Sequence, residues 1–331
     1  MRIAINGLGR VGRALLRQAV LSEDLEVVAV NDLADPHTLA ALLRRDTTYG
    51  PFPVSVEAGD DCLVIDGRKV PWSSASTPTE LPWASYAVDV AVECTGKFRT
   101  GDTAGGHLEA GARKVVISAP GKGVDATFVY KVNHEDYNPE THEVVSNASC
   151  TTNCIIPMVK VIQDNFGIAS GYMTTVHAYT NDQSLLDAAH KDPRRARSAP
   201  NNIVPTSTGA ARTAGVIYPE LQGKVDGMSM RVPVADGSIT DFVARISNEA
   251  SADDVNAAFQ SAADGELSDI LEYAEAPLVS SDIVGNKASC VFDSQLTMSN
   301  GGTVKVLGWY DNEWGYSNRT CDLAAYMGEK L

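Results

Sequence analysis

The sequence predicts an α/β fold in two domains, a doubly wound parallel sheet followed by an α+β domain with a mixed or antiparallel sheet. The 331 residues are enough for two domains. Near the N-terminus, short apolar strands alternate with helical patterns, which is typical of parallel βαβ units. After Phe166, strand-like segments follow one another without intervening helices, which favours the second kind of sheet. We therefore expect the first domain over 1–149 and the second over 150–312.

The composition is ordinary for a soluble globular protein, with 44% hydrophobic and 21% charged residues. The net charge of −15 argues against nucleic acid as the main partner, because phosphate backbones attract basic surfaces. The N-terminus lacks the apolar core of a signal peptide, and no apolar run is long enough to span a membrane. The six cysteines have no metal-ligand spacing, so we expect reduced thiols, a cytoplasmic protein and no metal site.

A dinucleotide-binding motif opens the chain. A short apolar strand precedes Gly7-Leu8-Gly9-Arg10-Val11-Gly12, a helical pattern follows, and the next strand ends at Asp32. A bare GxGxxG is a weak signal, but the order strand, GxGxxG, helix, strand, acid is specific. Gly7 allows the tight turn, Gly9 lets the backbone approach a pyrophosphate, and Gly12 lets the helix pack closely. Because Asp32 suits the ribose hydroxyls of adenosine, we expect a Rossmann-type domain that binds a dinucleotide.

The rest of the first domain continues this pattern. Residues 38–45 predict a helix, and Asp66-Gly67 between two short apolar runs predicts a hairpin. Residues 88–96 and 114–120 predict buried parallel strands that end in small residues. Strand ends of this kind line the cofactor crevice of doubly wound sheets.

The second domain begins where a strand turns into a helix. Residues 143–145 are β-branched or acidic, and a helical pattern runs from Ile155 to Phe166, with Pro157 expected to kink it. Cys150 lies at the start of this helix, with Cys154 one turn later. A helix N-terminus favours a thiolate over a thiol, and it also favours a bound anion.

His177 lies inside a predicted strand at 172–180, so Cys150 and His177 are a candidate nucleophile and base. Taken singly, each has an ordinary structural explanation. Residues 180–203 form a long, polar and basic loop, and long loops are often functional. The other elements that we predict are strands at 171–179, 224–233, 238–247 and 302–309, one or two helices over 251–273, and a terminal helix at 318–327.

These segments together resemble the phosphorylating glyceraldehyde-3-phosphate dehydrogenase family of bacterial and eukaryotic type. The resemblance runs from Ile3 almost to the C-terminus and is more specific than any single motif. The motifs that carry it are Ala148-Ser149-Cys150-Thr151-Thr152-Asn153-Cys154, His177-Ala178-Tyr179-Thr180-Asn181-Asp182-Gln183, Pro205-Thr206-Ser207-Thr208-Gly209-Ala210-Ala211, Met230-Arg231-Val232-Pro233 and Trp309-Tyr310-Asp311-Asn312-Glu313-Trp314-Gly315-Tyr316-Ser317-Asn318-Arg319.

The resemblance implies an NAD-dependent oxidoreductase that converts glyceraldehyde 3-phosphate and inorganic phosphate to 1,3-bisphosphoglycerate, in glycolysis or gluconeogenesis. It implies that Cys150 forms a hemithioacetal and then a thioester. His177 would first raise the thiolate fraction of Cys150 by ion pairing and then act as the base. It also implies a homotetramer, in which 180–203 is an S-shaped loop between subunits, and a C-terminal helix, 313–331, that folds back onto the NAD-binding domain.

The resemblance also assigns the binding residues. Two are expected on the substrate phosphate, Thr180 and Arg231. Five are expected around the attacking phosphate: Ser149, Thr151, Thr208 and Gly209, with Arg195 nearby. Eleven are expected along the cofactor: Gly7, Gly9, Arg10, Val11, Gly12, Asp32, Thr95, Gly96, Ser118, Asn312 and Tyr316.

Some features leave alternatives open. The family usually has an arginine near the adenine where this chain has Ser76-Thr77-Pro78, so that contact is not carried over. Asp32 and Leu33 favour NAD, whereas Ala188-Ala189 replaces a Leu-Pro pair of NAD-linked relatives and favours residual use of NADP. An erythrose-4-phosphate dehydrogenase is the nearest alternative enzyme, and a thiol redox sensor is the alternative from another class.

Overall fold

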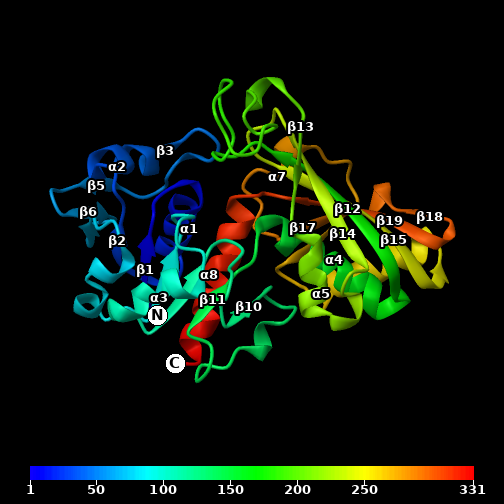
Figure 1. Cartoon of the computed structure of the whole chain (residues 1–331), viewed down its shortest axis with the longest axis horizontal. Coiled ribbons are helices and arrows are strands. Elements are labelled where there is room, and N and C mark those ends of the chain that lie inside the picture. Colours follow the sequence, from blue (N-terminus) through cyan, green and yellow to red (C-terminus); the bar gives the residue numbers. More distant parts are fainter. The chain divides into compact units, whose positions relative to one another are not determined.

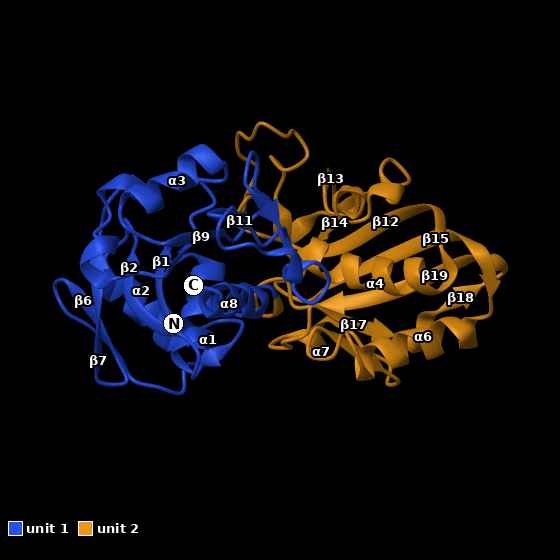
Figure 2. Ribbon diagram, turned by 90° about the horizontal axis from the view of Figure 1, so that it is seen from below, with its two compact units in different colours: residues 1–149, 316–331 blue, residues 150–315 orange.

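The computed structural model describes residues 1–331 and divides into two compact units (Figures 1 and 2). Unit 1 comprises Met1–Ser149 and Tyr316–Leu331, and unit 2 comprises Cys150–Gly315. Residues 313–315, which we expected with the terminal helix, therefore lie in unit 2. No helix combines the length and the apolar character needed to cross a membrane.

Unit 1 is built on a nine-stranded sheet in the order β10-β11-β9-β8-β1-β2-β7-β6-β5. Its strands from β10 to β7 pair in parallel, and β7, β6 and β5 pair antiparallel. The strands are β1 (Arg2–Asn6), β2 (Glu26–Asn31), β5 (Val56–Ala58), β6 (Cys62–Ile65), β7 (Arg68–Ser73), β8 (Val90–Glu93), β9 (Lys114–Ile117), β10 (Ala126–Thr127) and β11 (Val144–Ser146). The helices are α1 (Arg10–Val20), α2 (Pro36–Arg44), α3 (Gly101–Glu109) and the terminal α8 (Trp314–Glu329), and a separate short ribbon pairs β3 (Arg45–Asp46) with β4 (Gly50–Pro51).

The sheet extends from β1 in both directions, with β2 on one side and β8 on the other, so it is doubly wound as predicted. The strands β8 and β9 are buried along their whole length, which explains their continuous apolar sequence. Leu15 and Leu16 of α1 join Leu323 and Met327 of α8 in one buried cluster over the sheet. The hydroxyl of Ser317 in α8 also donates a hydrogen bond to the Val11 carbonyl at 3.3 Å.

The predicted hairpin turn is present between β6 and β7. Asp66 and Gly67 have φ angles of 50° and 75°. Two consecutive positive φ angles are the signature of the type I′ turn that Asp-Gly favours, because its twist matches that of the flanking strands.

Unit 2 contains an eight-stranded mixed sheet, in which β13-β14-β12-β15-β19-β17-β16 form the main order and β18 pairs with β19. Its long central strand, β12, pairs in parallel with β14 and antiparallel with β15. The strands are β12 (Ile168–Ala178), β13 (Val204–Ser207), β14 (Val225–Val232), β15 (Ser238–Ala250), β16 (Leu271–Ala274), β17 (Cys290–Asp293), β18 (Met298–Ser299) and β19 (Gly301–Tyr310). The helices are α4 (Cys150–Phe166), α5 (Ala214–Ile217), α6 (Ala252–Asp264) and α7 (Ser280–Ile283), and α4 lies against β15 and β19 (Figure 2).

The prediction of helix over 251–273 is right for its first half and wrong for its second. Ser251 caps α6, because its side chain accepts a hydrogen bond from the Asp254 N–H while Asp254 binds the Ser251 N–H. The helix ends at Asp264, before Gly265, and Leu271–Ala274 forms β16 on the sheet edge next to β17. Tertiary pairing with β17 thus overrides a local sequence that is also compatible with a helix.

Candidate active site

Cys150 is the first residue of α4, and it directly follows a strained turn. Ala148, two residues earlier, has a φ of 54°, a conformation that costs a residue with a Cβ about 1–2 kcal/mol. Within unit 1, the Tyr316 hydroxyl donates a hydrogen bond to the Ala148 carbonyl at 3.0 Å, and the Ala148 N–H donates to Ser146. These bonds hold the turn in place just before the candidate nucleophile.

The two cysteines of α4 differ in their surroundings. Cys150 keeps partial exposure, whereas Cys154 is completely buried and donates a weak hydrogen bond to the Gly308 carbonyl at 3.5 Å. Of these two thiols, that of Cys150 is the more exposed.

The structure brings Cys150 and His177 together within unit 2. The Sγ atom of Cys150 lies 3.5 Å from Nε2 of His177, which is on β12. On the other side of the ring, Nδ1 lies 2.7 Å from the Ala178 carbonyl, which can only accept a hydrogen bond. Nη1 of Arg231 is farther from the same atom, at 3.2 Å, so the shorter contact favours a proton on Nδ1, and the lone pair of the neutral ring on Nε2 then faces the thiol.

Burial acts against the ion pair that we expected between these side chains. It raises the pKa of the Cys150 thiol to about 11, although the positive charge of Arg231 and a hydrogen bond from Thr151 act in the opposite direction. Burial lowers the pKa of His177 to about 3, and the charge of Arg231 lowers it further. Desolvation thus favours the neutral forms of both side chains, a thiol and an imidazole. His177 remains placed to take the proton when sulfur attacks.

Tyr310, at the end of β19, fixes α4 relative to β12. Its buried hydroxyl lies 2.9 Å from Oγ1 of Thr151 and 2.8 Å from Oγ1 of Thr175. Its ring meets the His177 ring edge to face, with 5.9 Å between the centroids. The hydroxyl of Thr151, which we expect around the attacking phosphate, is thus hydrogen-bonded to the Tyr310 hydroxyl. The sequence motifs include Tyr310 but give no signal of this role.

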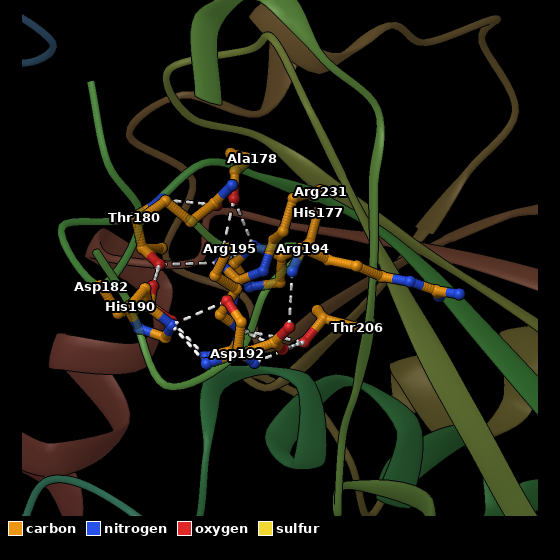
Figure 3. A network of polar contacts seen from close by, with 11 residues as sticks. His177, Ala178, Thr180, Asp182, His190, Asp192, Arg194, Arg195, Thr206 and Arg231 are labelled. Carbon is orange, nitrogen blue, oxygen red and sulfur yellow. Dashed lines mark hydrogen bonds and ion pairs between the residues drawn. The ribbon is translucent and has the colours of Figure 1, made fainter. Parts of the chain in front are cut away.

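Arginines and hydroxyls gather beside His177 (Figure 3). Arg231 stands opposite His177 in the parallel pairing of β12 with β14, and its Nη1 atom donates to Oγ1 of Thr180 at 2.8 Å. Nε and Nη2 of Arg195 donate to Oγ1 of Thr206, at 2.9 and 2.7 Å. Asp182 accepts hydrogen bonds from both Thr180 and Arg195.

Two buried donors in this cluster have no hydrogen-bond partner in the chain. They are Nε of Arg231 and Nε2 of Gln183, whose amide oxygen is 3.4 Å from the Thr180 N–H. Because an unpaired buried donor costs about 1–3 kcal/mol, such groups point to a ligand that supplies acceptors. An anion fits them best.

Two of the remaining residues expected on phosphate are not drawn into this network. Thr208 and Gly209 follow β13, and neither forms a hydrogen bond with Arg195 or Arg231. The Thr208 hydroxyl accepts the Ala210 N–H instead, at 3.2 Å, and Gly209 is exposed. Ser149 is the last residue of the first segment of unit 1.

Unit 1 contains a pocket of about 250 Å³ at the carboxyl ends of β1, β2 and β8. Four predicted cofactor residues line it, namely Gly7, Gly9, Asp32 and Thr95. Other lining residues were not predicted for this site, namely Asn6, Asn31, Cys94, Lys97 and Phe98, and Leu33 and Ala75-Ser76-Thr77 also line it. Asp32 accepts hydrogen bonds from the N–H groups of Leu8 and Ala34, at 2.7 and 2.9 Å, so its carboxylate is held beside the glycine-rich turn.

The glycine-rich turn fits a dinucleotide. A Cβ at Gly12 would lie 1.9 Å from the Gly7 carbonyl oxygen, so only glycine lets α1 pack this closely. A Cβ at Gly9 would meet nothing within 4 Å, which leaves open space beside the backbone for a pyrophosphate. Gly7 itself has a φ of 94°, which glycine adopts without strain.

The other predicted cofactor residues have mostly structural contacts within their own units. Arg10 pairs with Asp46, the Val11 carbonyl accepts from Ser317, and Gly96 has a φ of 69°. Ser118 donates to the Glu93 carbonyl at 2.9 Å, and Tyr316 is the residue that holds the turn at Ala148. In unit 2, Asn312 is buried, and its Oδ1 atom accepts a hydrogen bond from Ser238 at 2.8 Å.

Comparisons with known proteins give one answer for the whole chain. Residues 1–101 match the NAD binding domain of glyceraldehyde 3-phosphate dehydrogenase, and residues 149–312 match its C-terminal domain. Glyceraldehyde-3-phosphate dehydrogenase 2 of Streptomyces avermitilis is 52% identical over 336 residues, covering 100% of this chain and 99% of the relative. The enzyme of Geobacillus stearothermophilus is 50% identical over 331 residues, with the same coverage. This chain therefore belongs to the glyceraldehyde-3-phosphate dehydrogenase family.

Proposed function

We propose that this chain oxidises D-glyceraldehyde 3-phosphate in the presence of inorganic phosphate, forms 1,3-bisphosphoglycerate and reduces NAD, as an enzyme of glycolysis and gluconeogenesis. The observation that carries the proposal is the thiol of Cys150 facing the unprotonated Nε2 of His177, beside a cluster of anion-binding groups. A thiol-base pair alone would also suit a hydrolase. The NAD-binding domain and the unpaired buried donors favour a dehydrogenase of a phosphorylated aldehyde.

The residues of this chain suit each proton transfer. His177 takes the Sγ proton as sulfur adds to the aldehyde carbon and returns it to the aldehyde oxygen, giving a hemithioacetal. His177 removes that proton again as the carbon loses hydride, and the product is a thioester on Cys150. When bound, NAD supplies the hydride acceptor. Phosphate then attacks the thioester carbon, the C–S bond breaks, and the sulfur recovers a proton from His177.

The binding groups would divide between two phosphates. Thr180 and Arg231 would bind the substrate phosphate, and Arg195 with Ser149, Thr151, Thr208 and Gly209 would surround the attacking phosphate. Guanidinium groups and hydroxyls bind phosphate well, and the Arg231–Thr180 hydrogen bond at 2.8 Å already joins the first pair. The proposed cofactor residues are Gly7, Gly9, Arg10, Val11, Gly12, Asp32, Thr95, Gly96, Ser118, Asn312 and Tyr316.

We also propose a homotetramer in the cytoplasm, with the loop 180–203 at a subunit contact. Large apolar side chains in this loop are strongly exposed, with Leu185 74%, Leu186 72% and Ile203 67% accessible. Such exposure is typical of surfaces that a partner covers. Sedimentation of the full chain tests this assembly, and a monomer at micromolar concentration would contradict it.

The catalytic assignment is tested by three variants and the absorbance of NADH. Cys150→Ser should lower kcat/KM on the order of 10³-fold or more, because a hydroxyl is a far weaker nucleophile. Cys154→Ser should leave most of the activity, because its thiol is buried against Gly308. His177→Asn should slow both turnover, on the order of 10²- to 10⁴-fold, and alkylation of the thiol, while NAD binding stays intact.

Peptide mapping after iodoacetamide treatment completes this test, and preferential labelling at Cys154 in the native protein would contradict the assignment. The same assay without inorganic phosphate should show little NADH. Erythrose 4-phosphate as the better substrate would favour the alternative dehydrogenase.

A further inference from the structure

Asp182 holds two of the donors that an anion would need (Figure 3). Its Oδ1 atom accepts the hydrogen bond of the Thr180 hydroxyl, and its Oδ2 atom accepts one from Nη1 of Arg195. The Asp182 carboxylate thus connects Thr180, which is bonded to Arg231, with Arg195 later in the loop 180–203. The motif HAYTNDQ contains Asp182, but nothing in the motif indicates a role for this residue.

The proton of Thr180 is already used. A threonine hydroxyl has one proton, and here that proton goes to Asp182. The oxygen of the same hydroxyl accepts from Nη1 of Arg231 at 2.8 Å. Thr180 can therefore donate to an incoming phosphate only after its bond to Asp182 breaks.

Arg195 is occupied in a similar way. Two of its nitrogens, Nε and Nη2, face Thr206, and the third, Nη1, faces Asp182. A second carboxylate, Asp192, lies farther off, 3.6 Å from Nε. Asp182 therefore takes an N–H group of Nη1, the one nitrogen of Arg195 that does not face Thr206.

Asp182 is charged and remains within reach of solvent. Burial would raise its pKa, but the hydrogen bond from Thr180 and the charges of Arg231 and Arg195 outweigh that effect and hold the pKa below its usual value. Its side chain is 39% exposed, so an anion from solution can approach and replace it.

We propose that Asp182 is an internal anion that competes with phosphate for Thr180 and Arg195, so that only an anion that binds these donors more strongly than a tethered carboxylate occupies the site. The inference rests on the proposed function only for the identity of the phosphates. A free carboxylate carries the same charge as Asp182 and lacks the advantage of being tethered to the site. A phosphate dianion brings more charge and an additional acceptor oxygen, so it can displace Asp182.

The test compares two carboxylate variants of the full chain by calorimetric titration, without aldehyde. Asp182→Asn keeps an acceptor for Thr180 but removes the charge. Asp192→Asn is the matched control, because Asp192 faces Arg195 and does not contact Thr180. Inorganic phosphate should bind about three- to tenfold more tightly to Asp182→Asn, the scale of a partly exposed charge pair, and less than about twofold more tightly to the control.

Acetate should also gain affinity in Asp182→Asn, because every anion that needs the same donors competes with the Asp182 carboxylate. A purely structural role would not raise the affinity for either anion. Weaker or unchanged phosphate binding in both Asp182→Asn and Asp182→Ala, at an unchanged Tm, would overturn the proposal and make Asp182 a residue that positions the donors. If either variant unfolds, the other is decisive, and unfolding of both would show that Asp182 is a structural anchor and overturn the proposal as well.

These titrations are independent of turnover. Absence of NADH formation by the wild-type chain would contradict the proposed function while the phosphate titrations still report on Asp182. Conversely, an active enzyme whose phosphate affinity ignores Asp182 would contradict only the competition.

Discussion

Glu93 is the most heavily bonded buried side chain next to the cofactor pocket. Its carboxylate accepts hydrogen bonds from Asn6 at 2.6 Å, from the Thr95 N–H at 2.7 Å and from the Thr95 hydroxyl. His107 adds a fourth donor, because its Nδ1 atom accepts from Nε1 of Trp83 at 2.9 Å and its Nε2 proton is then directed at Glu93, 3.0 Å away. Glu93 thus holds Thr95, a lining residue of the pocket, in place.

Trp83→Phe tests this network. It leaves Nδ1 of a buried histidine without a donor, so the free energy of unfolding should fall by about 1–3 kcal/mol. Trp72→Phe is the matched control, because Trp72 donates to Ser74 at an exposed position and its loss should cost less than about 1 kcal/mol. Chemical denaturation measures both, and equal losses would mean that the buried bond contributes little.

The residues that could be predicted from the sequence are those with a motif of their own. Cys150 and His177 were found because a helix start and a strand carry specific neighbours, and the structure places Sγ of Cys150 3.5 Å from Nε2 of His177. Glu93 lies in none of the quoted motifs, and the motifs that contain Tyr310 and Asp182 give no signal of their contacts. Their roles depend on contacts with residues of other segments, such as His107 for Glu93, and the spacing of residues along the chain does not predict those contacts. The effect of burial on the pKa values of the pair could not be predicted either, because burial is not visible in a motif.

At the scale of elements, the glycine-rich turn packs directly against α1, and two of its glycines have different roles. Gly12 provides close contact between the helix and the Gly7 carbonyl, and Gly9 faces open space. The parallel strands were predictable because their apolar runs are buried on both faces. Strand β16 was not, since it forms only through its pairing with β17.

Alanine at each glycine separates these tasks. Gly12→Ala should lower the Tm and reduce yield, because its Cβ would lie 1.9 Å from a backbone oxygen. Gly9→Ala should fold with a nearly unchanged Tm and bind NAD on the order of tenfold more weakly, because the new methyl group would stand in the space left for the pyrophosphate. Thermal unfolding and fluorescence titration of NAD measure the two effects. Unchanged NAD affinity in Gly9→Ala would show that the pyrophosphate does not approach there.

At the scale of the whole molecule, the signals for cofactor choice come from both units. In unit 1, the pocket is lined by two charged residues, Asp32 and Lys97. In unit 2, the loop carries the small pair Ala188 and Ala189, which the family resemblance associates with space for an additional phosphate. From the sequence we expect Asp32 to dominate and NAD to be preferred with residual use of NADP, and the structure adds how firmly the Asp32 carboxylate is held.

The hydrogen bonds of Asp32 support the expected preference for NAD. Because two backbone N–H groups fix its carboxylate, Asp32 cannot swing away from a 2′-phosphate, and like-charge repulsion in a partly buried site outweighs the space gained by small side chains. Asp32→Ala removes that repulsion and leaves Lys97 as the charged lining residue, so the preference should move strongly toward NADP, by a factor on the order of 10² or more. The measurement is the ratio of kcat/KM for NAD and NADP in both proteins at one ionic strength. Lys97→Met in the Asp32→Ala background is the control. It should reverse part of the shift toward NADP, since it removes the cation without restoring the acid. A wild-type enzyme that prefers NADP, or a ratio that Asp32→Ala leaves unmoved, would show that the loop in unit 2 outweighs Asp32.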